Sequence, residues 1–348
     1  MENILVFVSV IAGVIFLSGL LFFVTRRTPE KGDESAADYA AGLNYLVSGD
    51  LTMALTKLKD AVKKNTENID AYIRIGDILR DAGHVDQAIK VHRDLTARTN
   101  LDISSQLLIL RSLETDFEKK GSYPSALKVI ERIYSFKKGD LWAQERELLI
   151  YEKMKNWKKA EEVYRRVAKQ KNKIDNERLA SYCLERGRVL RSQEKAKDAR
   201  DAFREAIKID KSYFPAYAEL SDAYQSEKRE PDALETLKRF VRDNPDAAAH
   251  AFERIKELLF RIGEFGEIEN VYLQVIEGSP ENWDAYLALA QVKDKKGEID
   301  DAIDLCKQVL QKNPDYAKAR EFLVRYYHRC GKDDLAVEQA LAIINADS

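Results

Sequence analysis

Histidine, cysteine and paired acidic side chains are the residues of this sequence that could support catalysis or hold a metal. The four histidines fall in different helical segments: His84, His92, His250 and His328. The three cysteines have no CxxC spacing, which argues against a disulfide framework or a cysteine zinc site: Cys183, Cys306 and Cys330. Pairs such as Asp300–Asp301 follow a turn glycine and begin a predicted helix, where carboxylates stabilise the helix N-terminus.

Recognised catalytic and cofactor motifs are absent from the sequence. It holds no GxGxxG, GxxxxGK[ST] or HExxH pattern, and GEFGE at 263–267 falls in a turn between predicted helices rather than after a strand. We therefore expect no catalytic residue, no cofactor and no metal, and an enzyme is the least favoured class. It would gain support only if His84 or His92 converged with carboxylates on one pocket. The net charge of −2 gives no global attraction toward nucleic acid.

A repeat of 34 residues organises most of the chain. Gly42, Gly49 and Ala54 recur as Gly76, Gly83 and Ala88, and near the other end Gly297 and Ala302 recur as Gly331 and Ala336. Apolar residues at helical spacing flank each glycine, so one unit is a helix, a tight turn and a second helix. This is the tetratricopeptide signature. We count nine units, starting near residues 35, 69, 107, 141, 180, 214, 249, 283 and 317.

A stacked array of such units has a long groove lined by the first helix of each unit. Helical phase places two acids, one amide and four arginines on that side: Asp77, Arg80, Arg188, Arg191, Asp222, Gln291 and Arg325. Arginines along a groove can bind a peptide carboxylate or an acidic segment of a partner. The alternative is that they are solvated positions of amphipathic helices, and the sequence leaves both open.

A second charged feature is the stretch 153–173, with nine lysines or arginines against Glu161 and Glu162. It could contact anionic lipid headgroups or an acidic partner, although a solvated helix face is the more common explanation of such a run.

Residues 4–24 form an uncharged, mainly apolar run. At about 1.5 Å per residue this run is long enough to cross a bilayer, and no cleavage motif follows it. Arg26 and Arg27 follow the run, so the positive-inside rule places the N-terminus outside and the repeats in the cytoplasm. Ser9 and Gly13 form a small-xxx-small pair that could contact another membrane helix. We thus expect an all-α chain: a transmembrane anchor at 1–27, a linker at 28–34 and a repeat superhelix at 35–348.

Several segments together resemble one bacterial family. An anchor followed by Arg-Arg, then DYAAGLNYLVSGDLTMA and IGDILRDAGHVDQAIKVH, and later ERLASYCLERG and KDARDAFREAIKID, is similar to the lipopolysaccharide assembly protein B (LapB, YciM) family. The resemblance implies an inner-membrane adaptor that links an FtsH-like AAA+ protease to an LpxC-like deacetylase client and so regulates lipopolysaccharide synthesis.

In one respect the sequence departs from that family. Its members carry a rubredoxin-like metal module with two cysteine pairs after the repeats, whereas Cys330 stands alone in HRCGKDD. The sequence therefore suits a relative that works without this module or one with a different task. The rival interpretation is a general repeat scaffold for another envelope assembly or secretion machine. A homo-oligomer is compatible with either.

Overall fold

A computed structural model describes residues 31–346, and over this range the chain is built of α-helices joined by short turns. The predicted anchor, with Ser9 and Gly13, lies outside the described residues. Within residues 31–346 no helix is both long and apolar enough to cross a membrane. The first described helix begins at Lys31, inside the segment predicted as a linker.

The chain divides into two compact units, residues 1–155 and 156–348. The first unit contains α2 (Lys31–Ser48), α3 (Leu51–Lys64), α4 (Ile69–Asp81), α5 (Val85–Thr96), α6 (Ile103–Lys119), α7 (Tyr123–Phe136) and α8 (Leu141–Lys153). The second contains α9 (Trp157–Lys171), α10 (Asn176–Ser192), α11 (Ala196–Ile209), α12 (Phe214–Ser226), α13 (Glu230–Asp243), a 3₁₀ turn η1 (Pro245–Ala247), α14 (Ala249–Ile262), α15 (Glu267–Gly278), α16 (Trp283–Lys295), α17 (Ile299–Lys312), α18 (Ala317–Arg329) and α19 (Asp333–Ala346).

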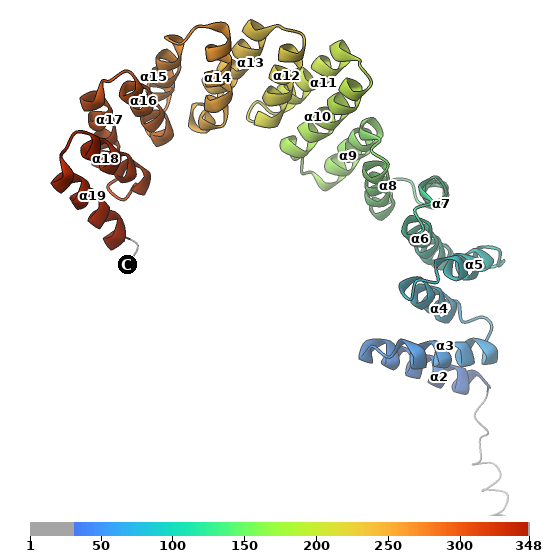
Figure 1. Ribbon diagram of the computed structural model, residues 1–348. Coiled ribbons are helices and arrows are strands. Elements are labelled where there is room, and N and C mark those ends of the chain that lie inside the picture. The colour runs from blue at the N-terminus through green and yellow to red at the C-terminus, as the bar shows by residue number, and fades with distance from the viewer. Residues whose placement is uncertain (1–30, 347–348) are drawn as a thin grey trace, which may run out of the picture. The chain divides into compact units, whose positions relative to one another are not determined.

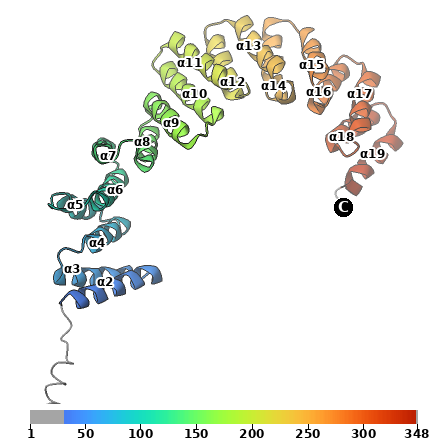
Figure 2. The same cartoon turned by 180° about the vertical axis from the view of Figure 1, so that it is seen from behind.

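Within each unit, consecutive helices pack in pairs, such as α4 with α5 and α10 with α11 (Figures 1 and 2). Six of the nine predicted unit starts coincide with the first residue of a helix, among them Ile69, Phe214 and Trp283. The all-α, tetratricopeptide-like repeat predicted from the sequence is therefore confirmed over the described residues.

Alanines and glycines allow the two helices of a pair to approach closely. The marker alanines of the second helices are buried, and Ile268 takes this place in α15. Gly76 and Gly187 lie where a Cβ atom would come within 2.4 Å of the His92 and Phe203 rings of the facing helices. A side chain at either glycine would force the two helices apart.

Turns between paired helices use the left-handed backbone conformation, which glycine adopts at least cost. Gly49, Gly83 and Gly297 have φ near 80° there. Three turns lack glycine, and Lys155, Glu194 and Lys228 take positive φ values instead. The repeat thus keeps its turn geometry where its sequence marker is lost.

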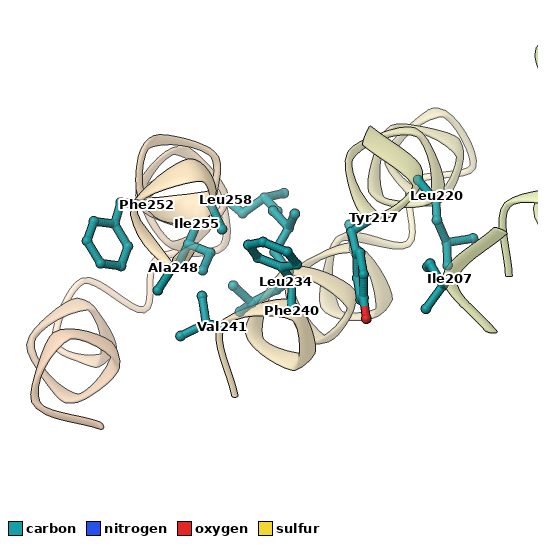
Figure 3. Close-up of a cluster of buried hydrophobic side chains, with 14 of the residues drawn as sticks. Ile207, Tyr217, Leu220, Leu234, Phe240, Val241, Ala248, Phe252, Ile255 and Leu258 are labelled. Carbon is teal, nitrogen blue, oxygen red and sulfur yellow. The ribbon is translucent and has the colours of Figure 1, made fainter. Parts of the chain in front are cut away.

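In the second unit an apolar cluster runs between successive helices from α10 to α16 (Figure 3), and a separate one continues from α16 to α19. Phe240 of α13 packs at 5.1 Å, ring centre to ring centre, from Tyr217 of α12, and Ile255 of α14 continues the layer. Removing a fully buried aromatic ring of this kind costs about 3–5 kcal/mol. This layer holds α12, α13 and α14 in place and so positions the charged residues on their exposed sides.

Candidate partner-binding surface

All seven residues predicted to bind partners lie on the first helix of a pair. Asp77 and Arg80 are on α4, Arg188 and Arg191 on α10, Asp222 on α12, Gln291 on α16 and Arg325 on α18. The predicted helical phase thus selects one class of helix throughout. The surroundings of these residues differ, however, and they separate into an ion-paired group and a group beside an apolar groove.

In the second unit the ion-paired group connects neighbouring first helices. Glu219 of α12 accepts from Arg188 at 2.6 Å and pairs with Arg191 at 2.5 Å, both on α10. One step further, Asp222 of α12 pairs with Arg254 of α14 at 2.6 Å. These charges are already neutralised within the chain, so a partner's carboxylate must compete with Glu219 for the arginines.

The pKa of Arg188 reflects these contacts. Partial burial of the guanidinium acts to lower its pKa, but the hydrogen bonds to Glu219 and Glu185 outweigh it, so the pKa lies above its usual value. The guanidinium therefore keeps its charge, and salt is a variable that weakens ion pairs exposed to solvent in this way.

In the first unit, Asp77 and Arg80 belong to a partly buried network that reaches α5 and α6. Arg80 donates to Asp77 at 2.7 Å and to Asp116 at 3.2 Å. Asp116 is fully buried and lies 2.6 Å from Nδ1 of the equally buried His92. Nε2 of His92 lies 3.1 Å from the carbonyl oxygen of Ile73.

Both ring nitrogens of His92 have a hydrogen-bond partner. A backbone carbonyl only accepts, so Nε2 donates to Ile73, and the contact on the other side joins Nδ1 to the Asp116 carboxyl group. Arg80 adds an ion pair to the same carboxyl group. The network holds α4, α5 and α6 together, which assigns Asp77 and Arg80 a structural role whatever else they do.

An apolar groove, which we call the aromatic groove, lies over α14, α15, α16 and α18 in the second unit. Its volume is about 560 Å³, and its apolar floor includes Phe252, Leu259, Ile268, Leu287 and Phe322. At its edge Phe260 and Phe265 are 55% and 54% exposed, with ring centres 5.0 Å apart. Volumes of 300–1,000 Å³ with mainly apolar walls are typical of binding sites.

The rim of the aromatic groove is basic. Four lysines line it, of which Lys256 pairs with Glu253, Lys318 with Asp284 and Lys296 with Glu269. Lys295 is exposed and makes no ion pair with a described residue. Two of the sequence-predicted residues belong to this region: Gln291 lines the groove, and the Arg325 guanidinium lies 4.5 Å from the ring centre of Phe322.

One cluster has the donor types of a metal site: Glu161, Cys183 and Glu205 lie within 4.8 Å of one another. Arg186 lies among them, donating to Glu161 at 3.1 Å and pairing with Glu205, and Arg165 also pairs with Glu161. Burial, together with the two carboxylates, raises the pKa of the Cys183 thiol to about 12. Since metals bind the thiolate, and two arginines already balance the two carboxylates, the cluster is an ion-pair network.

The four histidines do not converge on a common pocket. His84 precedes α5, His250 stacks on Phe214, and the exposed His328 lies 2.7 Å from Asp333. His92 does meet carboxylates, Asp116 at 2.6 Å and Asp77 at 4.0 Å, but it is fully buried. The sequence condition for an enzyme asked for such a cluster on a pocket, which this buried contact does not provide.

The fold and this surface define an all-α protein of tetratricopeptide-like repeats. A family model described as the ARM repeat of tetratricopeptide repeat protein 21 matches residues 177–336. Over nearly its whole length the chain is similar to lipopolysaccharide assembly protein B. It is 22% identical to the Escherichia coli K12 protein over 298 residues, covering 84% of this chain and 76% of the relative.

The Haemophilus influenzae protein of the same name is 24% identical over 307 residues, with 84% and 76% covered. The resemblance inferred from the sequence is thus confirmed. Solved structures similar to the chain include a tetratricopeptide repeat protein from Parabacteroides merdae, 14% identical, with a TM-score of 0.39 over 88% of this chain and 100% of that one. Another is MamA, 24% identical, with a TM-score of 0.32 over 46% and 94%.

Proposed function

We propose that this chain is a membrane-anchored scaffold of the lipopolysaccharide assembly protein B type, which recruits other proteins during envelope biogenesis. The observation that carries the proposal is the similarity to that protein, which extends over 84% of this chain and 76% of the relative. Helical-repeat proteins bind protein partners along extended surfaces, and the first helices here present both charged rows and an apolar groove.

In this proposal residues 1–27 insert into the bacterial inner membrane and contact its lipids, and the repeats face the cytoplasm. The repeats hold an LpxC-like deacetylase close to an FtsH-like membrane protease, so that the client is degraded when lipopolysaccharide is sufficient. Tethering both proteins raises their effective concentration without any chemistry by the scaffold. Arg80, Arg188 and Arg191 are the proposed contacts for acidic segments of these partners.

The rubredoxin-like metal module of the family does not fit the cysteines of this chain. Such a module needs two cysteine pairs, but Cys183 and Cys306 are buried on separate helices and Cys330 ends α18. No step of the proposed function runs through a metal.

The test is co-purification of the full-length chain from gently solubilised membranes, with partners identified by mass spectrometry. The proposal expects the membrane protease and the deacetylase. Recovery of outer-membrane assembly or secretion components instead would replace it with the general scaffold.

A double charge reversal, Arg188→Glu with Arg191→Glu, then tests the arginine assignment. The matched control is Arg242→Glu on α13, a second-helix arginine that also pairs with a glutamate. Partner recovery should fall at least tenfold in the double variant and stay unchanged in the control. Equal recovery in both would remove the arginines from the partner-binding site while leaving the scaffold role intact.

A further inference from the structure

The exposed side of α19 carries an apolar stripe. Val337, Leu341 and Ile344 are 57%, 53% and 61% exposed, and their i, i+4, i+7 spacing places them in one row along the helix. The other side of α19 packs against α18, with Ala336 buried. Contiguous exposed apolar side chains of this kind usually mark a surface that another molecule covers.

The charges of α19 are all negative. From Asp333 to Ala346 the helix contains no lysine, arginine or histidine. Asp334 and Glu338, four residues apart, form a row next to the apolar stripe. Neither makes an ion pair with a described residue, so α19 presents an apolar row with an unneutralised acidic edge.

The aromatic groove has a similar apolar surface but the opposite charge. Its floor is apolar and four lysines line its rim; three of them pair with Glu253, Asp284 and Glu269, and the ammonium of Lys295 makes no ion pair with a described residue. Its lining on α16 extends from Asp284 to Lys295, about 16 Å along the helix axis, whereas the stripe on α19 covers about 10 Å. The stripe is therefore short enough to lie within the groove, and its acidic edge complements the basic rim.

We propose that the aromatic groove of one copy of this chain binds α19 of a second copy. Val337, Leu341 and Ile344 would lie on the phenylalanine-rich floor, and Asp334 and Glu338 would approach the lysine rim. The chain's own α19 does not fill its groove, since none of the groove lining comes from α19. Reciprocal exchange between two copies makes the contact twice and closes a two-fold dimer. This inference is independent of the proposed function.

Disulfide cross-linking in membranes of cells that express two differently tagged full-length copies tests the contact at residue level. Both copies carry Cys330→Ser, because Cys183 and Cys306 are fully buried while Cys330 is partly exposed. One copy carries Gln291→Cys in the groove and the other Leu341→Cys on α19. The matched control replaces Gln291→Cys with Leu273→Cys, an exposed α15 position outside the groove lining.

The proposal expects a cross-linked species containing both tags for the 291/341 pair and none for the 273/341 pair. Adding Phe260→Asp to the groove copy should abolish the species, and since Phe260 is exposed this change spares the core. No 291/341 species, an equal 273/341 species, or a species that survives Phe260→Asp would each overturn the proposal. Protection of the 291 thiol by another protein or by lipid, without cross-linking to α19, would also overturn it and would identify a different occupant.

Discussion

Replacing Asp116 by alanine should loosen α4, α5 and α6 strongly, because its side chain contacts both His92 and Arg80. His92 and Asp116 are both fully buried, and Arg80 is mostly so. Without Asp116, Nδ1 of the buried His92 loses its hydrogen-bond partner and Arg80 loses one of its carboxylates. Removing one partner from a buried ion pair costs about 3–5 kcal/mol. Arg80 keeps its 2.7 Å contact with Asp77, so we expect the lower end, about 3 kcal/mol.

Amide hydrogen exchange measured by mass spectrometry is the suitable assay, because repeat arrays open locally and a single melting curve averages over all pairs. About 3 kcal/mol corresponds to roughly hundredfold faster exchange in the amides of α4 to α6. Asp116→Asn keeps one acceptor oxygen and should give a smaller rise.

The control is Asp86→Ala. It breaks an exposed ion pair with Lys120 that joins α5 to the end of α6, and exposed pairs contribute little. If Asp116→Ala accelerated exchange no more than Asp86→Ala does, the network would not hold these helices together.

Three further predictions follow from individual contacts. Gly187→Ala places a Cβ atom 2.4 Å from the Phe203 ring. The overpacking cost of about 1–3 kcal/mol should exceed the helix-propensity gain of up to about 1 kcal/mol, so the melting temperature should fall. Gly266→Ala is the control, because the space around Gly266 is open. Burial raises the pKa of the Cys183 and Cys306 thiols to about 12, so at pH 8 a thiol reagent should label Cys330 quickly and the other two only after denaturation; three equally fast thiols would contradict this. Burial acts to raise the pKa of Asp140, but the Ala143 N–H, Lys137 and Arg111 outweigh it and hold the pKa below its usual value. The resulting stability is present above the unfolded carboxyl pKa of about 3.9 and is lost as pH falls through the folded pKa. Asp140→Asn should therefore lower the urea midpoint at pH 7 and leave it unchanged near pH 2.

The repeat could be predicted because its signals are local. Gly76 and Ala88 are small because a facing helix lies against each, and that requirement recurs every 34 residues in the sequence. The left-handed turns at Lys155, Glu194 and Lys228 could not be predicted the same way. Their sequences carry no glycine marker. At Glu194 and Lys228 the packing of the two flanking helices holds the turn in place.

The charged residues show the limit of helical phase. Phase placed Arg188 and Arg191 on the first helix of a pair, but it did not reveal their common partner Glu219, which lies on α12, about 30 residues away, where any acidic residue would look solvated. The burial of Asp116 could not be predicted from the sequence either, because a carboxylate in an amphipathic helix usually faces water. The groove was missed because Phe260 and Phe265 look like ordinary core residues until their exposure is known.

The ion-paired arginines Arg188 and Arg191 and the aromatic groove differ in how tightly they can bind a partner. A partner that binds Arg188 must displace Glu219, whose carboxylate is held on the same fold and therefore has a high effective concentration. Such exchange yields little net free energy, although it steers acidic partners toward the surface in a salt-dependent way. Among the described residues the exposed phenyl rings of the aromatic groove have no such competitor to displace, and covering them removes apolar area from water at about 25 cal/mol per Å². Raising the salt concentration should therefore weaken contacts made through Arg188 and Arg191 much more than contacts made in the groove. Suppose that moderate salt released a second copy of the chain as readily as it released an acidic partner. The second copy would then bind at Arg188 and Arg191 rather than in the aromatic groove.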